Sequence, residues 1–224
     1  MASRSDLYLP VLALLVLAPS AAPAEPAGAI AGTVEIAKVS VGSRVDGFGP
    51  VIIYLEDAPE AQLATDKHYE IVQRDKTFTP SFLIVPKGAT IEFPNRDKLA
   101  HNVFSPAAGA AFDLGIYKQE TTKSVTFDKA GLVPIFCNIH PQMIAHVLVV
   151  ANRFYVHPDA NGKFKLDGVP PGTYHAVAWF PFGTSERAEV TVQAGKQTEL
   201  RFTLRERKAV ADHRNKLDKP YTRY

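Results

Sequence analysis

The sequence predicts an all-β protein with a sandwich or barrel architecture. Short runs of β-branched and aromatic residues recur along the chain, and some alternate apolar with polar residues, as in Thr90-Ile91-Glu92-Phe93. Turn-forming residues separate these runs, and no long segment has convincing helical spacing. Many short strands joined by close turns are typical of a sandwich, because each strand offers one face to a shared core.

The first 24 residues have the order of a secretory signal peptide. A polar segment with Arg4 precedes an apolar run from Leu7 to Ala18, and small residues ending at Ala24 follow. An uncleaved anchor is the alternative, but this run is shorter than the ~20 apolar residues that span a bilayer. The sequence therefore predicts cleavage after Ala24, a periplasmic or secreted protein, and no later membrane span.

The formal net charge of +2 is unevenly distributed along the chain. From Arg205 to Tyr224, seven Lys or Arg residues stand against three Asp or Glu residues, a net of +4, whereas residues 25–204 carry −2. Such a basic tail is usually solvated, although it could contact an acidic partner or a membrane surface. Nucleic-acid binding has little support.

The N-terminal part of the mature chain predicts two strands, at residues 29–36 and 51–55, with a glycine-rich turn region between them. Two alternatives are expected for these strands. They are either the first strands of the domain that follows, which then contains a long insertion, or a hairpin added at the edge of that domain. Residues 57–67 contain helix-forming residue types and predict a short helix or an irregular loop.

From His68 onward the strand pattern becomes regular. Turn residues such as Pro86-Lys87-Gly88 and Asn95-Arg96-Asp97 punctuate it. Seven strands are predicted, at residues 69–73, 82–85, 90–93, 102–104, 124–127, 133–137 and 146–150.

The heptapeptide Cys137-Asn138-Ile139-His140-Pro141-Gln142-Met143 combines a thiol, an imidazole and a thioether. Cys137 is the only cysteine, so it cannot form an intrachain disulfide, and bonding to a metal would protect it in an oxidising compartment. Soft sulfur with imidazole suits copper, and one cysteine, two histidines and a weak axial methionine form a blue-copper centre. His101, 36 positions before Cys137, is the candidate for the second histidine.

With these residues the chain resembles the plastocyanin-like cupredoxins over residues 69–150. Two residues separate Cys137 from His140 and two separate His140 from Met143, which is similar to the amicyanin and pseudoazurin branch. The chain departs from this family at Ala145-His146, near which a glycine is common. The matching residues include Phe78-Thr79-Pro80, Asn95, His101-Asn102-Val103, Phe136-Cys137, His140-Pro141 and Met143.

The resemblance implies a Greek-key sandwich with one type 1 copper per chain, held by His101, Cys137, His140 and Met143. It also implies a carrier of single electrons rather than an enzyme, with a redox enzyme or cytochrome as partner, such as an amine dehydrogenase or a respiratory enzyme. Electrons would pass through a partly exposed His140. The amide of Asn95 is expected to tie the two ligand loops together.

A second resemblance begins at Arg153, where the chain looks like the transthyretin-like sandwich found beside carboxypeptidases. It rests on residues 155–164, 166–174 and 177–179, in which Asn161-Gly162 and Pro170-Pro171-Gly172 mark turns. Residues 188–192 and 199–204 are expected to complete the sheets of this scaffold or docking module. The predicted organisation is a signal peptide (1–24), a copper domain with an N-terminal extension (25–151), the small sandwich (152–205) and a basic tail (206–224).

Each proposed ligand also has a simpler explanation, since a lone cysteine is often a small buried hydrophobe. Their joint occurrence at this spacing favours copper. A thioether is a poor zinc ligand, a dinuclear copper centre needs a second cysteine, and multicopper oxidases have histidines where this chain has Phe136 and Asn138. The alternatives left open are a copper carrier or interaction module without redox turnover, and an oxidoreductase subunit. No metal spacing links the other histidines, His68, His146, His157, His175 and His213.

Overall fold

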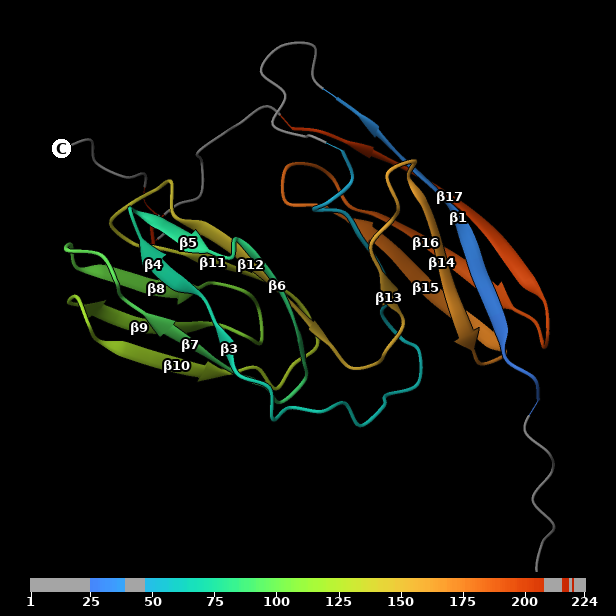
Figure 1. Ribbon diagram of the computed structural model, residues 1–224, viewed down its shortest axis with the longest axis horizontal. Helices are drawn as coiled ribbons and strands as arrows, with labels where there is room; N and C mark the ends of the chain where they lie inside the picture. Colours follow the sequence, from blue (N-terminus) through green and yellow to red (C-terminus); the bar gives the residue numbers. More distant parts are fainter. Residues whose placement is uncertain (1–24, 39–46, 208–214, 218, 220–224) are drawn as a thin grey trace, which may run out of the picture.

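In the part of the chain that the structure describes, every regular element is a β-strand, and the strands form two sandwiches that lie side by side (Figure 1). The computed structural model describes residues 25–38, 47–207, 215–217 and 219. Within these ranges, no helix is long and apolar enough to cross a membrane. The all-β prediction is confirmed. Residues 57–67, for which a helix or a loop was expected, form an irregular connection.

The first sandwich contains strands β3 to β12. Its larger sheet has the order β6-β12-β11-β8-β9, and its smaller sheet has the order β10-β7-β3. A hairpin of β4 and β5 lies beside them. The strands are β3 Tyr69–Glu70, β4 Val72–Arg74, β5 Thr77–Thr79, β6 Phe82–Pro86, β7 Thr90–Pro94, β8 His101–Ser105, β9 Phe112–Tyr117, β10 Thr122–Thr126, β11 Gly131–Phe136 and β12 Ile144–Val150.

The core of the first sandwich lies between these layers. Apolar side chains from both sheets meet there, among them Ile91 and Phe93 on β7 and Ile135 on β11, all fully buried. Burial of such side chains contributes about 1.5–3 kcal/mol each relative to exposure. Cys137 and Met143 belong to the same buried cluster, so the sequence stretch with the candidate ligands is anchored in the core.

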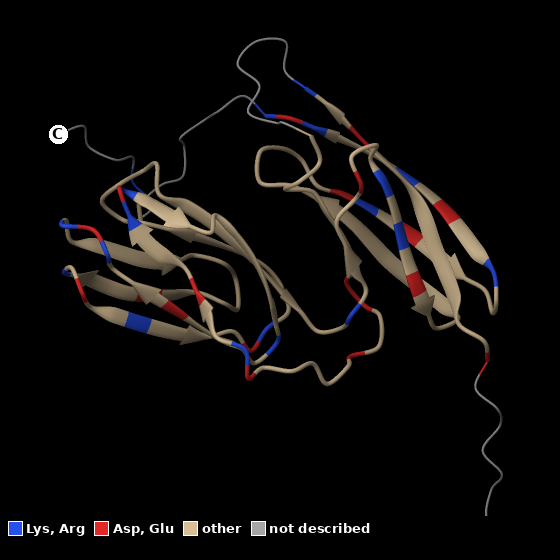
Figure 2. Ribbon diagram, in the orientation of Figure 1, with Lys and Arg blue, Asp and Glu red and all other residues tan. Residues whose placement is uncertain are grey.

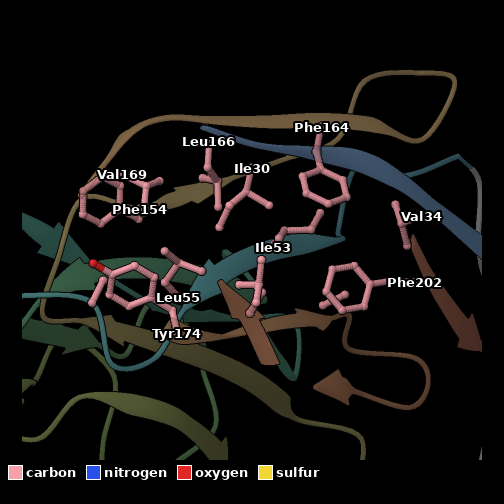
Figure 3. Packing of buried hydrophobic residues seen from close by; sticks show 14 of the residues in the cluster. Ile30, Val34, Ile53, Leu55, Phe154, Phe164, Leu166, Val169, Tyr174 and Phe202 are labelled. Carbon is pink, nitrogen blue, oxygen red and sulfur yellow. The ribbon is translucent and has the colours of Figure 1, made fainter. Parts of the chain in front are cut away.

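The second sandwich combines the two strands that precede the first sandwich with the five that follow it. One sheet has the order β14-β1-β17 and the other the order β13-β2-β15-β16. Ile30, Ile53, Phe164 and Phe202 meet between them (Figure 3). The strands are β1 Gly28–Ala37, β2 Ile52–Leu55, β13 Tyr155–Val156, β14 Lys163–Val169, β15 Gly172–Trp179, β16 Glu186–Val192 and β17 Gln197–Arg205.

The two N-terminal strands lie where the sequence analysis did not place them. They were expected in the domain of residues 25–151, as its first strands or as an edge hairpin. Instead β1 pairs in parallel with β17 and antiparallel with β14, while β2 lies between β13 and β15 in the opposite sheet. The first sandwich is therefore an insertion between β2 and β13 of the second.

The two sandwiches share a small apolar interface. The outer face of β6, β11 and β12 packs against β2 and β15 through a third buried cluster that includes Ile52, Leu148 and Trp179. The ring of Trp179 lies 5.2 Å from that of Phe82 and 5.0 Å from that of His146, between centroids. The connections from β2 to β3 and from β12 to β13 also join the two sandwiches.

Candidate metal centre

Strand register brings His101 beside Cys137. β8 starts at His101, β11 ends at Phe136, and the two strands run antiparallel with Phe104 opposite Phe136. In an antiparallel pair the start of one strand lies beside the end of the other. The loop that follows β11 therefore begins next to His101.

The loop from Cys137 to Met143 is closed by its own backbone. The Cys137 N–H donates to the Met143 carbonyl oxygen at 3.2 Å, and the Met143 N–H donates to the His140 carbonyl oxygen at 3.1 Å. The side chains of Cys137 and Met143 are fully buried. This tight turn directs the Cys137 and His140 side chains toward the same space.

The candidate ligand atoms of His101, Cys137 and His140 all lie within 4.8 Å of one another. The two histidine Nδ1 atoms are 3.0 Å apart, and the Cys137 Sγ is 3.7 Å from the His140 Nδ1. Two ligands of one tetrahedral ion with bonds of about 2.0–2.3 Å would lie roughly 3.3–3.6 Å apart. The cluster is thus close to the dimensions of a mononuclear site, and its soft sulfur and two imidazoles fit copper.

Met143 was predicted to be the weak axial ligand. It is fully buried in the same core cluster as Cys137, at the end of the loop that also carries His140. Its position agrees with that role, which stays a prediction.

Asp97 orients the ring of His101, a role that the sequence analysis missed. Its Oδ2 lies 2.9 Å from the His101 Nε2 and accepts the backbone N–H of Lys76, also at 2.9 Å. Because a carboxylate can only accept a hydrogen bond, Nε2 donates its proton to Asp97, and Nδ1 is left as the ring nitrogen that faces the candidate metal site. The available signal was an acidic residue four positions before a candidate ligand.

Asn102, rather than Asn95, ties the two ligand loops together. The Asn102 Oδ1 accepts the backbone N–H of Asn138 at 3.1 Å, which joins the residues that directly follow His101 and Cys137. Asn95 donates instead to the carbonyl oxygens of Leu99 and Tyr117, and so braces the approach to His101. The prediction for Asn95 was wrong, because the amide that reaches across the two loops belongs to the residue next to the ligand.

Hydrogen bonds favour the thiolate form of Cys137. Burial raises the pKa of the thiol, but the His101 ring and backbone N–H groups of the ligand region outweigh burial and lower the pKa below its ordinary value. For His101, burial lowers the pKa, while Cys137 and Asp97 raise it to a net value above the ordinary one. Burial, His101 and Lys76 together lower the pKa of His140.

His140 is the candidate histidine nearest to solvent. His101 is fully buried, whereas His140 is partly exposed and its neighbour Ile139 is 37% exposed. Leu99, on the loop that leads to His101, is 43% exposed. Basic and acidic residues alternate in the sequence at residues 74–76 and 96–98. Figure 2 shows both kinds of charge in the turns of the first sandwich.

His146 lies outside the candidate site. It pairs with Pro134 and Phe82 within the larger sheet, and its ring contacts Trp179 at the interface between the sandwiches. Burial lowers its pKa to about 4. Of the two residues that depart from the family pattern, His146 thus lies at the interface between the sandwiches, whereas Ala145 is buried in the core cluster that contains Cys137.

Two family models match the chain. Residues 48–150 match the cupredoxin-like domain, and residues 141–205 match the carboxypeptidase regulatory-like domain. No curated protein matches the chain. Both resemblances inferred from the sequence are confirmed.

Similar solved structures include a purple cupredoxin from Nitrosopumilus maritimus, with 20% identity and a TM-score of 0.34 over 37% of this chain and 99% of that one. A reduced Cu(I) form of an amicyanin variant at pH 4 has 26% identity and a TM-score of 0.36, over 44% of this chain and 98% of that one. A reduced tryptophan-to-tyrosine variant of amicyanin has 27% identity, with the same TM-score and coverage.

Proposed function

We propose that this chain, in which a cupredoxin-like domain is joined to a carboxypeptidase regulatory-like domain, is an exported type 1 copper protein that carries single electrons. The proposal rests on the convergence of His101, Cys137 and His140 in a largely buried cluster, with Met143 at the end of the same loop. One copper ion per chain is the cofactor that this donor set favours.

The residues around the site favour a fixed geometry. When bound, copper supplies a one-electron change between its two oxidation states. Asp97 holds the His101 ring and Asn102 holds the start of the ligand loop, so both ligands keep their positions. The core cluster around Cys137 and Met143 keeps water from the thiolate. Ligands that keep their positions need little structural rearrangement when the bound copper gains or loses an electron.

His140 is the proposed entry and exit point for electrons. It is the ligand candidate that reaches the surface, with the exposed Ile139 beside it. The apolar side chain and the neighbouring charged turns support docking of a redox enzyme or a cytochrome. An amine dehydrogenase or a respiratory enzyme is the partner class that the family resemblance suggests.

Voltammetry of the purified, copper-loaded protein tests this function. We expect one copper per chain and a reversible one-electron wave. The variant His140→Gly should retain copper but exchange electrons with small redox dyes at least about tenfold more slowly, because its surface ligand is gone. His68→Gly changes an exposed histidine outside the site and should behave as the wild type.

Three outcomes would count against parts of this proposal. Tight copper binding without a reversible wave would favour a copper carrier without redox turnover. Unchanged electron exchange in copper-loaded His140→Gly would rule out His140 as the route. Isolation only as part of a larger enzyme would favour an oxidoreductase subunit.

A further inference from the structure

Part of the basic tail lies beside the candidate metal centre. Residues 215–217 and 219 follow the second sandwich in the sequence, yet Lys216 contacts the first (Figure 1). The backbone N–H of Lys216 donates to the Asn138 Oδ1 at 2.9 Å, and the Lys216 Nζ donates to the Asp113 Oδ2 at 2.7 Å. One tail residue thus contacts both the ligand loop and β9.

These contacts close a ring of four hydrogen-bonded residues. Asn138 donates its backbone N–H to the Asn102 Oδ1 at 3.1 Å, and the Asn102 Nδ2 donates to the Asp113 Oδ1 at 2.6 Å. Lys216 completes the ring by bonding to Asn138 and Asp113. The two asparagines directly follow Cys137 and His101, so the ring lies next to two candidate metal ligands.

The tail segment forms a compact turn that presents Lys216. The Asn215 Oδ1 accepts the backbone N–H groups of Leu217 and Lys219, at 2.9 and 3.1 Å. The Asn215 N–H donates to the Lys219 carbonyl oxygen at 2.9 Å. Leu217 lines a surface groove of about 790 Å³ together with Phe104 and Phe136. Because the turn supplies its own hydrogen bonds, it does not depend on the ring for its shape.

The position and burial of Asn102 indicate that the ring of hydrogen bonds fixes the side chains next to the candidate ligands. Asn102 is fully buried, and its side chain is held at both ends, by Asn138 and by Asp113. A buried amide fixed at both ends keeps one rotamer, and groups that orient metal ligands strongly affect metal affinity. Asp113 is more exposed, and Lys216 neutralises its charge beside the site.

We propose that Lys216 and Asp113 are positioning residues of the metal centre. They lock Asn102 and Asn138, fix the separation of the His101 and Cys137 loops, and slow the loss of the metal. This inference rests on the proposed function, because it assigns the tail turn a role at the same copper site. Lys216 is then a structural part of the first sandwich, although it follows β17 of the second in the sequence.

Three single variants of the full chain separate the contacts of Lys216. Lys216→Ala removes only the ion pair with Asp113. Lys216→Pro also removes the N–H that bonds to Asn138, since proline has no backbone donor. Lys219→Ala is the matched control, because it removes one positive charge from the same turn, whose bonds to Asn215 use only the backbone of Lys219.

The first measurement is the rate at which the copper-loaded protein loses copper to a chelator in excess. We expect Lys216→Ala to lose copper about two- to threefold faster and Lys216→Pro about tenfold faster, since one and then two ring contacts are gone. Lys219→Ala should match the wild type. The effect of Lys216→Ala should also shrink in 1 M salt, where an exposed ion pair is screened.

A spectroscopic readout separates positioning from general stability. Lys216→Pro should shift the copper–thiolate absorption or the copper hyperfine splitting, whereas Lys219→Ala should leave both unchanged. Unchanged copper loss and unchanged spectra in Lys216→Pro would overturn the proposal.

Amide hydrogen exchange of the metal-free protein tests the ring independently of copper. The Asn138 N–H should exchange faster in Lys216→Pro than in the wild type, and equal rates would contradict the ring. A wild-type protein without a copper–thiolate band would contradict the proposed function. The hydrogen-exchange measurement would still show whether the hydrogen bonds of Lys216 protect the Asn138 N–H.

Discussion

At the scale of single residues, Asp97 places a negative charge on the far side of a candidate ligand. Hydrogen bonds from Lys76 and His101, with little opposition from burial, lower the pKa of this carboxyl to about 2. It is therefore charged under all ordinary conditions. A carboxylate bonded to imidazole makes the ring a stronger donor, which favours the more highly charged oxidation state of a bound metal.

Replacing Asp97 by asparagine should raise the reduction potential. The amide keeps the shape of the side chain but removes the charge, so Cu(II) loses more stabilisation than Cu(I). We expect an increase of about 60 mV, equivalent to a tenfold change for one electron, in a spectroscopic redox titration. The control is Asp75→Asn, which removes an equal charge from the neighbouring exposed turn. Equal shifts in the two variants would show that the hydrogen bond to His101 has no special effect.

The candidate copper ligands could be identified from the sequence, whereas the residues that orient them were only partly predictable. Cys137, His140 and Met143 share seven positions and carry distinctive chemistry, and His101 was the partner that a sandwich can bring beside them. The contacts of Asp97 and Asn102 depend on loop conformations and rotamers that no spacing rule specifies. Asn95 was assigned the wrong contact for this reason.

At the scale of elements, β1 and β2 show that an alternating pattern predicts a strand but not the strands with which it pairs. Alternation predicts that a segment is a strand and which residues share a face, but it does not identify the neighbouring strands. Residues 29–36 and 51–55 were therefore predicted as strands correctly, while their partners were not. β1 pairs with β17, at the far end of the chain.

Core substitutions in the two sandwiches should have separate effects. Ile30→Ala removes a fully buried side chain from the second sandwich and should cost about 2–5 kcal/mol of its stability. The copper absorption should remain. Ile91→Ala is the matched change in the first sandwich, where the buried cluster includes Cys137.

Denaturant titrations can follow both sandwiches in one sample. The fluorescence of Trp179, the single tryptophan, reports β15 of the second sandwich together with its interface to the first, whereas copper absorption reports the interior of the first sandwich. We expect Ile30→Ala to lower the midpoint of the fluorescence transition more than that of the copper transition, and Ile91→Ala to do the reverse. A change only in the copper transition of Ile30→Ala would contradict the pairing of β1.

At the scale of the whole molecule, the inserted arrangement could not be predicted from the sequence. Two domains in succession were expected, with a boundary near residue 151. The structure instead joins the first strand, β1, and the last, β17, in the second sandwich and brings the tail residue Lys216 back to the first. Long-range pairing of this kind depends on the shapes of both finished sandwiches, which local patterns do not describe.

The interface between the sandwiches should make stability dependent on pH through His146. Burial keeps its folded-state pKa at about 4, below the ordinary value of 6.5. Between these values the unfolded chain binds more protons, so the contribution of His146 is fully present above about pH 6.5 and is lost progressively as the pH falls to about 4. The upper limit of this loss is about 3 kcal/mol.

Unfolding of the metal-free protein at pH 7 and pH 4 tests this expectation. The variant His146→Gln cannot titrate, so it should lose less stability on acidification than the wild type. His68→Gln, a change of an exposed histidine, should retain the wild-type dependence. The same pH dependence in His146→Gln and in the wild type would contradict a role for this residue.

The absorption spectrum of the protein loaded with Cu(II) tests the central claim most directly. If Cys137, His101 and His140 bind copper together, thiolate-to-copper charge transfer should give an intense visible band at one copper per chain. Cys137→Ser should abolish the band. A wild-type protein that binds Cu(II) without this band would contradict the assignment of a type 1 copper centre.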